Sequence, residues 1–284
     1  MPEGHTIHRL AADLDERFGG GPVRAASPQG RFADGAALID GHRLTAAEAH
    51  GKHLFLGFDA APADGTGTPA TGRGTRWVHI HLGLYGKVTF GTGEPPPPRG
   101  QVRLRLASDG HWAELRGPNT CELITRGEKQ QLHQRLGPDP LRDDADPAVA
   151  YDRLTRSSVA VAALLLDQKI IAGVGNVYRA EVLFRRHLDP YLPGRALTRP
   201  EWDAVWADLV ELLHAGVRAN RIDTVRPEHT PQAMGRDPRV DGHGGEVYVY
   251  RRAHKPCLVC GTPVRTAPLL GRNLFWCPTC QPPR

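Results

Sequence analysis

The segments Cys257-Leu-Val-Cys260 and Cys277-Pro-Thr-Cys280 decide the fold at the end of this 284-residue chain. Sixteen residues lie between the two pairs. This spacing is typical of tetrahedral Zn2+ coordination, because each Cys-x2-Cys turn presents two thiolates and the intervening loop is long enough to fold back as a hairpin. We therefore predict one structural zinc, bound by Cys257, Cys260, Cys277 and Cys280.

The alternative for these cysteines is a pair of disulfides, which a reducing compartment disfavours. Residues 2–9 carry charges and histidines instead of an apolar run, so we expect no signal peptide and a cytoplasmic location. The chain also lacks a stretch of about twenty apolar residues, so we expect no membrane span. The fifth cysteine, Cys121, is predicted to be a small buried apolar residue and not a nucleophile.

Positive charge is concentrated around the predicted zinc site. Residues 218–284 contain 11 Lys and Arg against 5 Asp and Glu, whereas the rest of the chain contains 25 against 26. Such a basic segment indicates a polyanionic partner, most simply nucleic acid. The alternative is an ordinary solvated surface, since arginine-rich chains are often basic without binding a polyanion. The zinc hairpin in the same segment favours nucleic acid.

The length allows two domains with separate cores, and the hydrophobic period changes along the chain accordingly. Apolar residues recur at helical spacing from Ile7 to Phe18, which predicts one amphipathic helix at the start. Segments at 60–75 and 91–100 are expected to form solvent loops. Alternating patterns predict strands at 53–58, 77–82, 102–106 and 112–115, the last two joined by an Asp109-Gly110 turn.

Helices are predicted after residue 147. A polar, proline-bearing stretch at 139–147 is expected to be a hinge. Apolar helices are predicted at 159–168 and 177–186, with a tight turn, Gly173-Val-Gly-Asn176, between them. Backbone N–H groups of this turn stand at a helix start, where phosphate is favoured, although a simple packing role is the alternative.

A further helix is predicted where Thr198 and Glu201 form a capping box. Its tryptophans, Trp202 and Trp206, fall on the buried stripe and are expected to be core residues. After it we expect a mobile loop at 219–245, followed by a strand at 246–251.

The first residues of the chain include a candidate nucleophile. Removal of Met1 exposes the secondary amine of Pro2, and an α-amino group that titrates near about 8 is substantially neutral at physiological pH. Its adduct with an aldehyde is a charged iminium, which acidifies the adjacent C–H and promotes elimination. Glu3 is suited to open a sugar ring as an acid and then to act as a base. The alternative is an ordinary helix start, where Pro and Glu are both favoured.

Seven motifs spread over the whole chain resemble those of the formamidopyrimidine-DNA glycosylase and endonuclease VIII family. They are Met1-Pro-Glu-Gly4, Gly51-Lys52, His81-Leu-Gly-Leu-Tyr-Gly86, Arg135-Leu-Gly-Pro-Asp139, Leu166-Asp-Gln168, Ala172-Gly-Val-Gly-Asn176 and Gly271-Arg272 to Cys280. The resemblance implies an α+β, multidomain fold. Its parts are an N-terminal catalytic domain with a helix and a β-sandwich at 1–138, a helix-two-turn-helix domain at 139–245 and a zinc finger at 246–284.

The resemblance also implies an activity, that of a bifunctional DNA glycosylase and abasic-site lyase of base excision repair. Its partner is damaged DNA from which an oxidised base has been flipped, and we expect a monomer, nucleoid-associated when bound to DNA. Pro2 is then the Schiff-base nucleophile at the sugar C1′, and Glu3 is the proton donor and acceptor. Lys52 donates a proton during β-elimination, and Arg272 holds phosphate and assists δ-elimination.

Two further positions, Arg135 and Asn176, match family residues that contact the DNA backbone. The motifs mix two branches of the family, because Gly83-Leu84 resembles the formamidopyrimidine branch and Tyr85 the endonuclease VIII branch. Thr6 stands where many relatives have a second glutamate. The mixture resembles an actinobacterial endonuclease VIII-like subgroup. It leaves open which oxidised base is excised and whether duplex, bubble or single-stranded DNA is preferred.

Leu84 and Tyr85 are predicted to form a wedge, since an apolar and an aromatic side chain at a loop tip can fill the stack that a flipped base leaves. The alternative is a buried strand end. Two other interpretations of the chain stay open: a non-catalytic zinc-finger protein that binds nucleic acid, and an N-terminal-proline enzyme that acts on small carbonyl compounds. Pro2 and Glu3 argue against the first, and the basic zinc segment argues against the second.

Overall fold

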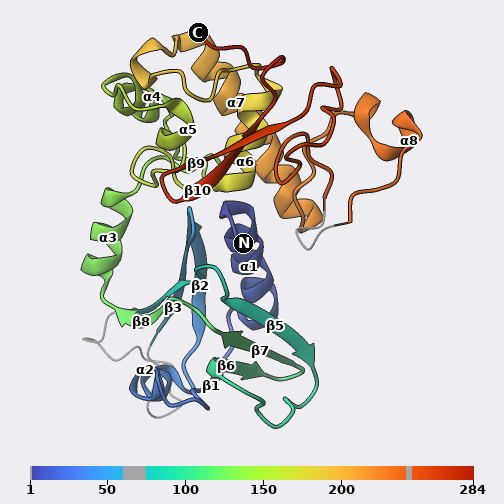
Figure 1. Ribbon diagram of the computed structural model, residues 1–284. Helices are drawn as coiled ribbons and strands as arrows, with labels where there is room; N and C mark the ends of the chain where they lie inside the picture. Colours follow the sequence, from blue (N-terminus) through green and yellow to red (C-terminus); the bar gives the residue numbers. More distant parts are fainter. Residues whose placement is uncertain (1, 60–74, 241–244) are drawn as a thin grey trace. The chain divides into compact units, whose positions relative to one another are not determined.

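The computed structural model describes residues 2–59, 75–240 and 245–284 (Figure 1). The chain divides into two compact units. The first contains Pro2 and residues 7–135, and the second contains residues 3–6 and 136–284. The division into three domains, at 138/139 and 245/246, stays a prediction. Over the described ranges, no helix has both the length and the apolar composition that a membrane crossing needs.

The first unit is built from two four-stranded antiparallel sheets, ordered β2-β3-β4-β8 and β1-β6-β7-β5. The strands of the first sheet are β2 (Leu44–His50), β3 (His53–Phe58), β4 (Arg76–His81) and β8 (Thr120–Ile124). Those of the second are β1 (Arg24–Ala26), β5 (Lys87–Thr92), β6 (Val102–Ser108) and β7 (His111–Arg116). The helices that accompany them are α1 (Gly4–Phe18), α2 (Ala33–Ile39) and α3 (Arg126–Arg135).

One apolar core is shared by the two sheets, which makes them a β-sandwich. Alternate residues of a strand face the same side, and Leu54 and Leu56 of β3 thus meet Leu104 and Leu106 of β6 in this core. Cys121 on β8 is buried there too, and burial raises the pKa of its thiol to about 12. It is the inert core residue that the sequence predicts. The apolar stripe of α1 joins the same core and confirms the predicted helix, through Ile7, Leu10, Ala11, Leu14 and Phe18.

The four predicted strands correspond to β3, β4, β6 and β7, and Asp109-Gly110 forms the turn between the last two, with Gly110 at φ +85°. The predicted loop at 91–100 is wrong at its start, because Gly91 and Thr92 end strand β5. A Cβ at Gly91 would lie 2.2 Å from the Trp112 ring across the strand pair, so glycine is required there by packing. Of the loop predicted at 60–75, residues 60–74 lie outside the described residues.

The second unit is mainly helical and ends in the zinc hairpin. Its longer helices are α4 (Pro147–Thr155), α6 (Asn176–Arg185) and α7 (Arg199–Ala219), and its shorter ones are α5 (Val161–Leu164), α8 (Pro231–Met234), η1 (Gly194–Ala196) and η2 (Pro227–His229). Strands β9 (Arg265–Leu269) and β10 (Arg272–Trp276) form an antiparallel hairpin, and β10 packs against α6 (Figure 1). One core runs from the helices into the hairpin.

Helix α7 confirms the predicted capping box, in which Thr198 and Glu201 exchange hydrogen bonds with each other's backbone amides. Trp202 of α7 is fully buried in the core of the second unit, and Trp206 packs against that core. Helix α6 likewise matches the prediction for 177–186 within one residue. The loop predicted at 219–245 contains η2 and α8, and its residues 241–244 lie outside the described residues.

The helix predicted at 159–168 is wrong in extent, because α5 covers only Val161–Leu164. The chain turns at Asp167, whose carbonyl accepts the N–H groups of Ile170 and Ile171 and whose side chain accepts that of Lys169. These local bonds compete with a continued helix.

The strand predicted at 246–251 is also wrong. The backbone N–H groups of Tyr248, Val249 and Tyr250 all point to the buried carboxylate of Glu181, at 2.7–2.9 Å. Three successive amides that converge on one anion cannot also alternate between two neighbouring strands. The segment therefore wraps around Glu181, which lies on α6 and is fully buried.

Candidate active site and zinc centre

Glu3 is fully buried at the start of the chain. Its carboxylate accepts the backbone N–H groups of Gly175 at 3.0 Å, Val177 at 2.9 Å and Tyr178 at 3.4 Å. These amides stand at the first turn of α6, where the helix dipole favours an anion. From the sequence, two roles are open for such amides, a contact with phosphate and simple packing. In the structure they meet the side chain of Glu3, because residues 3–6 and α6 belong to the same unit.

Two glycine contacts allow this close approach. A Cβ at Gly175 would lie 2.3 Å from Cδ of Glu3, so any side chain there would displace the carboxylate. The N–H of Gly4 donates to the carbonyl of Gly173 at 2.8 Å, and a Cβ at Gly4 would lie 2.8 Å from the Cα of Gly173. The 173–176 turn and the first residues of α6 therefore hold the backbone of Gly4 and the side chain of Glu3.

Pro2, the predicted nucleophile, directly precedes this anchored residue and is half-buried. On the other side, His5 is 5 % exposed and stands edge-on to the ring of Tyr178, with the ring centroids 5.4 Å apart. Burial is the main cause that lowers the pKa of His5 to about 4, so its ring is neutral at physiological pH. Sequence reasoning missed His5, because its spacing and neighbours do not distinguish it from the other histidines of the chain.

Asn176, the first residue of α6, ties the helix to the zinc hairpin. Its side-chain amide donates to the carbonyl of Asn273 on β10 at 3.1 Å. Arg179, one turn later, donates to the same carbonyl at 3.2 Å and also to the side-chain oxygen of Asn176. Asn176 is 6 % exposed, so the structure places it in a buried network beside Glu3. Its contact with DNA stays a prediction.

Arg272 lies at the tip of the zinc hairpin, as its sequence position predicts. The two turn residues before it, Leu270 and Gly271, have φ of +48° and +71°, which is the backbone of a tight two-residue hairpin turn. Arg272 itself is exposed. Burial, and then the charge of Arg272, lower the pKa of Arg179 to about 10. The charge of Glu3 acts on the pKa of Arg179 in the opposite direction, so both positive and negative groups lie near this end of α6.

Sequence reasoning missed Arg179, which is fully buried. The signal was present, since Arg179 follows Asn176 by three residues and must share its face of α6. The sequence does not show that the carbonyl of Asn273 would lie against this face.

Lys52 sits in the two-residue turn between β2 and β3, where Gly51 has φ +58° and His50 pairs with His53. Its side chain is partly buried. His53 also pairs with His81, the last residue of β4, so Lys52 lies at the same end of the sheet as the segment that follows β4. Arg135 ends α3 and is exposed.

Leu84 and Tyr85 form the tip of the loop after β4, and 51 % and 85 % of their surfaces are exposed. The loop is tight. Gly83 has φ +68°, and a Cβ at Gly86 would lie 2.2 Å from the carbonyl oxygen of Leu82. The alternative of a buried strand end is therefore wrong for both residues, because both side chains face solvent in this unit. Their insertion into DNA stays a prediction.

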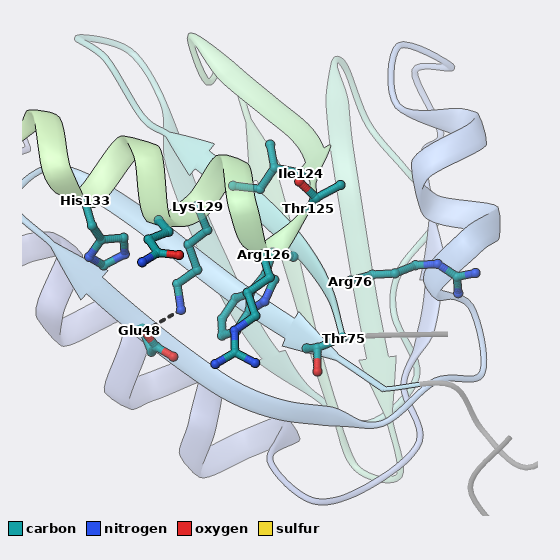
Figure 2. A pocket seen from close by; sticks show the side chains of 10 residues that line it. Glu48, Thr75, Arg76, Ile124, Thr125, Arg126, Lys129 and His133 are labelled. Atoms are coloured by element: carbon teal, nitrogen blue, oxygen red, sulfur yellow. Dashed lines mark hydrogen bonds and ion pairs between the residues drawn. The ribbon is translucent and has the colours of Figure 1, made fainter. Parts of the chain in front are cut away.

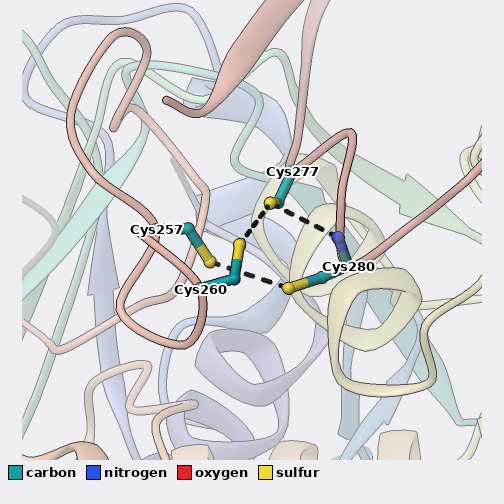
Figure 3. Close-up of side chains that lie close together, drawn as sticks. All are labelled: Cys257, Cys260, Cys277 and Cys280. Atoms are coloured by element: carbon teal, nitrogen blue, oxygen red, sulfur yellow. Dashed lines mark hydrogen bonds between the residues drawn. The ribbon is translucent and has the colours of Figure 1, made fainter. Parts of the chain in front are cut away.

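The four predicted zinc ligands converge in the second unit (Figure 3). All four Sγ atoms lie within 4.8 Å of one another, with Cys257 and Cys280 at 3.9 Å and Cys260 and Cys277 at 3.5 Å. Zn–S bonds of about 2.3 Å place tetrahedral sulfur ligands about 3.8 Å apart, so the cluster fits Zn2+. The amide of Cys280 points to Sγ of Cys277 at 3.5 Å, which suits a thiolate.

The zinc hairpin is supported by the helices of its own unit. The amide of Cys277 donates to the side chain of Gln281, whose own amide group donates to the carbonyl of Leu188 at 2.9 Å. A ring nitrogen of His187 lies 3.1 Å from the carbonyl oxygen of Cys280. The cysteine segment is therefore attached by hydrogen bonds to the residues that follow α6.

Three family models match the chain. The formamidopyrimidine-DNA glycosylase N-terminal domain matches residues 1–120, and the formamidopyrimidine-DNA glycosylase H2TH domain matches residues 136–226. The zinc finger found in FPG and IleRS matches residues 255–283. The chain belongs to the formamidopyrimidine-DNA glycosylase family. As a member it has the family's class of activity, DNA glycosylase and abasic-site lyase, and its fold has the N-terminal β-sandwich, helical H2TH and zinc-finger parts that the motifs imply.

Relatives within the family support the predicted subgroup. A protein of Mycobacterium tuberculosis named endonuclease 8 1 is 49 % identical over 99 % of this chain and 100 % of its own length. A probable endonuclease 8 2 of Streptomyces coelicolor is 31 % identical over 99 % of this chain and 94 % of its own. A formamidopyrimidine-DNA glycosylase of Gloeobacter violaceus is also 31 % identical.

Solved structures of the family share the fold. The MutM (Fpg) protein of Thermus thermophilus aligns over 99 % of this chain and 98 % of its own, with a TM-score of 0.71 and 26 % identity. Lactococcus lactis formamidopyrimidine-DNA glycosylase, solved with DNA that contains an abasic site, aligns over 99 % of this chain and all of its own. Its TM-score is 0.75 at 19 % identity, so it supports the fold alone.

Proposed function

We propose that this chain removes an oxidised base from DNA through a Schiff base on Pro2 and then cleaves the strand by β,δ-elimination. The observation that carries the proposal is the position of Glu3. Glu3 is a fully buried carboxylate that accepts three backbone N–H groups, and it directly follows Pro2 in the sequence. Glu181 is also a fully buried carboxylate that accepts three amides, and it has no catalytic role in the proposal, so the feature that supports catalysis is the position of Glu3 next to Pro2 in the sequence.

The proposed reaction needs proton transfers at Pro2 and at Glu3. The nitrogen of Pro2 attacks C1′ and passes its proton to the carboxylate of Glu3, the bond from C1′ to the base breaks, and the departing base takes a proton from water. The nitrogen lone pair then expels O4′, which takes a proton from Glu3, and an iminium is left on an opened sugar. Glu3, which is then a carboxylate again, takes a proton from C2′, and the 3′-phosphate leaves with the electron pair of its C–O bond. Loss of the 5′-phosphate follows, and water hydrolyses the iminium to release the enzyme.

The remaining site residues bind and orient the DNA in this proposal. Lys52 supplies a proton during β-elimination, and Arg272 holds a phosphate and assists δ-elimination. Arg135 and Asn176 contact the backbone. Exposed Leu84 and Tyr85 fill the stack from which the base is flipped. Zinc, held by the four cysteines, supplies no chemistry but keeps the hairpin of Arg272 folded.

The partner in this proposal is damaged DNA. The 49 % identical mycobacterial relative is named an endonuclease 8, which supports an oxidised base as the substrate class. The exposed guanidinium of Arg272 beside Arg179 supports a polyanion. A cytoplasmic monomer that associates with the nucleoid completes the proposal.

Borohydride trapping on an abasic-site oligonucleotide tests the covalent step. Reduction of the iminium should leave the Met1-processed enzyme cross-linked to DNA, and Pro2→Gly should lose most of the cross-link because its amine is primary and displaced. Glu3→Gln should lose most base excision, by 100-fold or more, because its amide cannot protonate O4′. Mass spectrometry first confirms that Met1 is absent, since an acylated proline has no free amine.

Glu16→Gln is the matched control, because Glu16 lies with an exposed side chain on the helix that follows Glu3 and should keep full activity. If the processed protein binds abasic DNA but never traps, the chemistry is wrong and the non-catalytic zinc-finger interpretation replaces it.

A further inference from the structure

The outer face of the sheet β2-β3-β4-β8 carries a cluster of histidines outside the predicted site. His53 on β3 and His79 on β4 point away from the sandwich core, because their neighbours Leu54 and Ile80 point into it. Helix α3 covers part of this face. Figure 2 shows His133 and Lys129 extending from α3 towards the strand that carries Glu48.

One chain of contacts runs across the middle strands. Nδ1 of His53 lies 2.8 Å from Nε2 of His79, and the two rings are stacked with centroids 5.1 Å apart. The other nitrogen of His79 lies 2.9 Å from the carboxylate of Glu122 on β8. A carboxylate acceptor makes this nitrogen of His79 the donor, so its partner nitrogen accepts from His53. The ring of His53 is thereby held in one orientation.

A second contact joins the hairpin to α3. Nδ1 of His50 lies 3.0 Å from Nδ1 of His133, whose ring also packs on Phe55 with centroids 4.9 Å apart. The helix is held beside it by Lys129, which pairs with Glu48 at 2.7 Å and lies over the ring of Trp77 at 3.2 Å. Helix α3 is strongly polar and buries no residue fully, so these side chains provide its attachment.

These two sets of contacts meet at one turn. His50 and His53 pair across β2 and β3, and the two residues between them are Gly51 and Lys52. We propose that His50, His53, His79 and His133 are positioning residues, which fix the turn so that the ammonium group of Lys52 reaches the reacting sugar. The inference rests on the proposed function, since it gives Lys52 its role there.

Each nitrogen-to-nitrogen hydrogen bond joins one N–H to one lone pair, so protonation of the accepting nitrogen, Nε2 of His79 in the first pair, would leave two donors facing each other. Burial, and then the neighbouring histidines, lower the pKa of His53 to about 3. Burial also lowers the pKa of His81, followed by the effects of His79 and Lys52. The charged or titratable groups that face the cluster are Glu48, Lys52, His81, Glu122 and Lys129.

Single-turnover cleavage of a preformed abasic-site duplex separates positioning from folding. His53→Phe keeps an aromatic ring but loses the hydrogen bond, so it should slow β-elimination about tenfold. Its borohydride trapping, which depends on Pro2, should stay within about twofold of the parent. In a Lys52→Ala background, His53→Phe should have no further effect on elimination, because the group that it positions is gone.

His133→Phe is a second variant in case His53→Phe does not fold, and it should behave in the same way. His111→Phe is the matched control, since His111 begins β7 in the other sheet, and it should leave elimination unchanged. Equal slowing by His53→Phe with and without Lys52 would overturn the inference and make the cluster purely structural. No slowing in either background would overturn it as well.

Hydrogen exchange of the Gly51 and Lys52 amides tests the same inference without any enzymatic activity. Exchange should be faster in His53→Phe and His133→Phe than in the parent or in His111→Phe. Unchanged exchange overturns the inference. If the parent never traps on DNA, the proposed function fails, whereas exchange still reports on the turn.

Discussion

The two units hold their proposed catalytic groups by different means. In the second unit, Glu3 is held by main-chain amides at the start of α6 and is fully buried. In the first unit, Lys52 is partly buried in a hairpin turn whose flanking residues, His50 and His53, make side-chain contacts. Backbone amides do not titrate, and they remain when the side chain at their position is substituted. Imidazoles titrate, and they are lost when the histidine is substituted. The Glu3 site therefore depends on space at glycines, and the Lys52 turn depends on the identity and charge of histidines.

Gly175→Ala should break the first arrangement with the largest effect. A Cβ at this position would lie 2.3 Å from Cδ of Glu3, so the carboxylate must leave its amides. We expect base excision to slow by about 100-fold, equivalent to about 2.7 kcal/mol of transition-state stabilisation. Single-turnover excision from damaged duplex DNA measures the loss.

Gly21→Ala is the control for that substitution, because a Cβ at Gly21 meets nothing within 4 Å. It should keep parental activity. If Gly175→Ala excises the base at the rate of the parent, the amides that bind Glu3 are not needed for catalysis.

Low pH should destabilise the histidine contacts of the first unit. The pKa of His53 is lowered from 6.5 to about 3 in the folded chain. In the unfolded chain His53 therefore binds a proton below about pH 6.5, whereas in the folded chain it binds one only below about pH 3. The contribution of neutral His53 to stability is complete above pH 6.5 and falls as the pH drops, by roughly 1.4 kcal/mol per pH unit.

Amide hydrogen exchange of β3, corrected for intrinsic rates, measures this loss at pH 7, 6 and 5. Between pH 6.5 and pH 5 we expect a loss of about 2 kcal/mol, which His53→Phe should largely remove. The pKa of His5 in the second unit is also lowered, so His5 too should make the fold less stable in acid. The exchange of α6 amides should therefore keep its dependence on pH in His53→Phe. An unchanged slope for β3 in His53→Phe would contradict the assignment.

Leu84→Ala tests a residue that is held neither by the amides around Glu3 nor by the histidines around Lys52. Its effect should be the smallest. Leu84 is 51 % exposed at a loop tip, so its truncation should not affect folding. Loss of one stacking contact should slow excision from duplex DNA about tenfold, about 1.4 kcal/mol, and barely affect a single-stranded substrate. Leu38→Ala, at an exposed leucine of α2, should slow neither. Equal slowing on both substrates would exclude a wedge.

Local patterns in the sequence were enough for several elements. The cysteine spacing predicts a cluster that the structure shows within 4.8 Å, and the apolar repeat from Ile7 to Phe18 predicts α1. The capping box predicts the start of α7. Each of these features depends on residues a few positions apart, whose geometry follows from helix, turn or metal-ligand spacing alone.

The sequence by itself determined which groups the protein can use, namely the N-terminal proline, the zinc cysteines and the glycines of the 173–176 turn. Only the tertiary structure decided which partners these groups meet. The amides of α6 bind Glu3, and those of 248–250 bind Glu181 in place of forming a strand. The histidine cluster likewise draws its members from β2, β3, β4 and α3. A buried charge or donor binds whichever partner the packing of distant segments brings to it, and local periodicity carries no information about that partner.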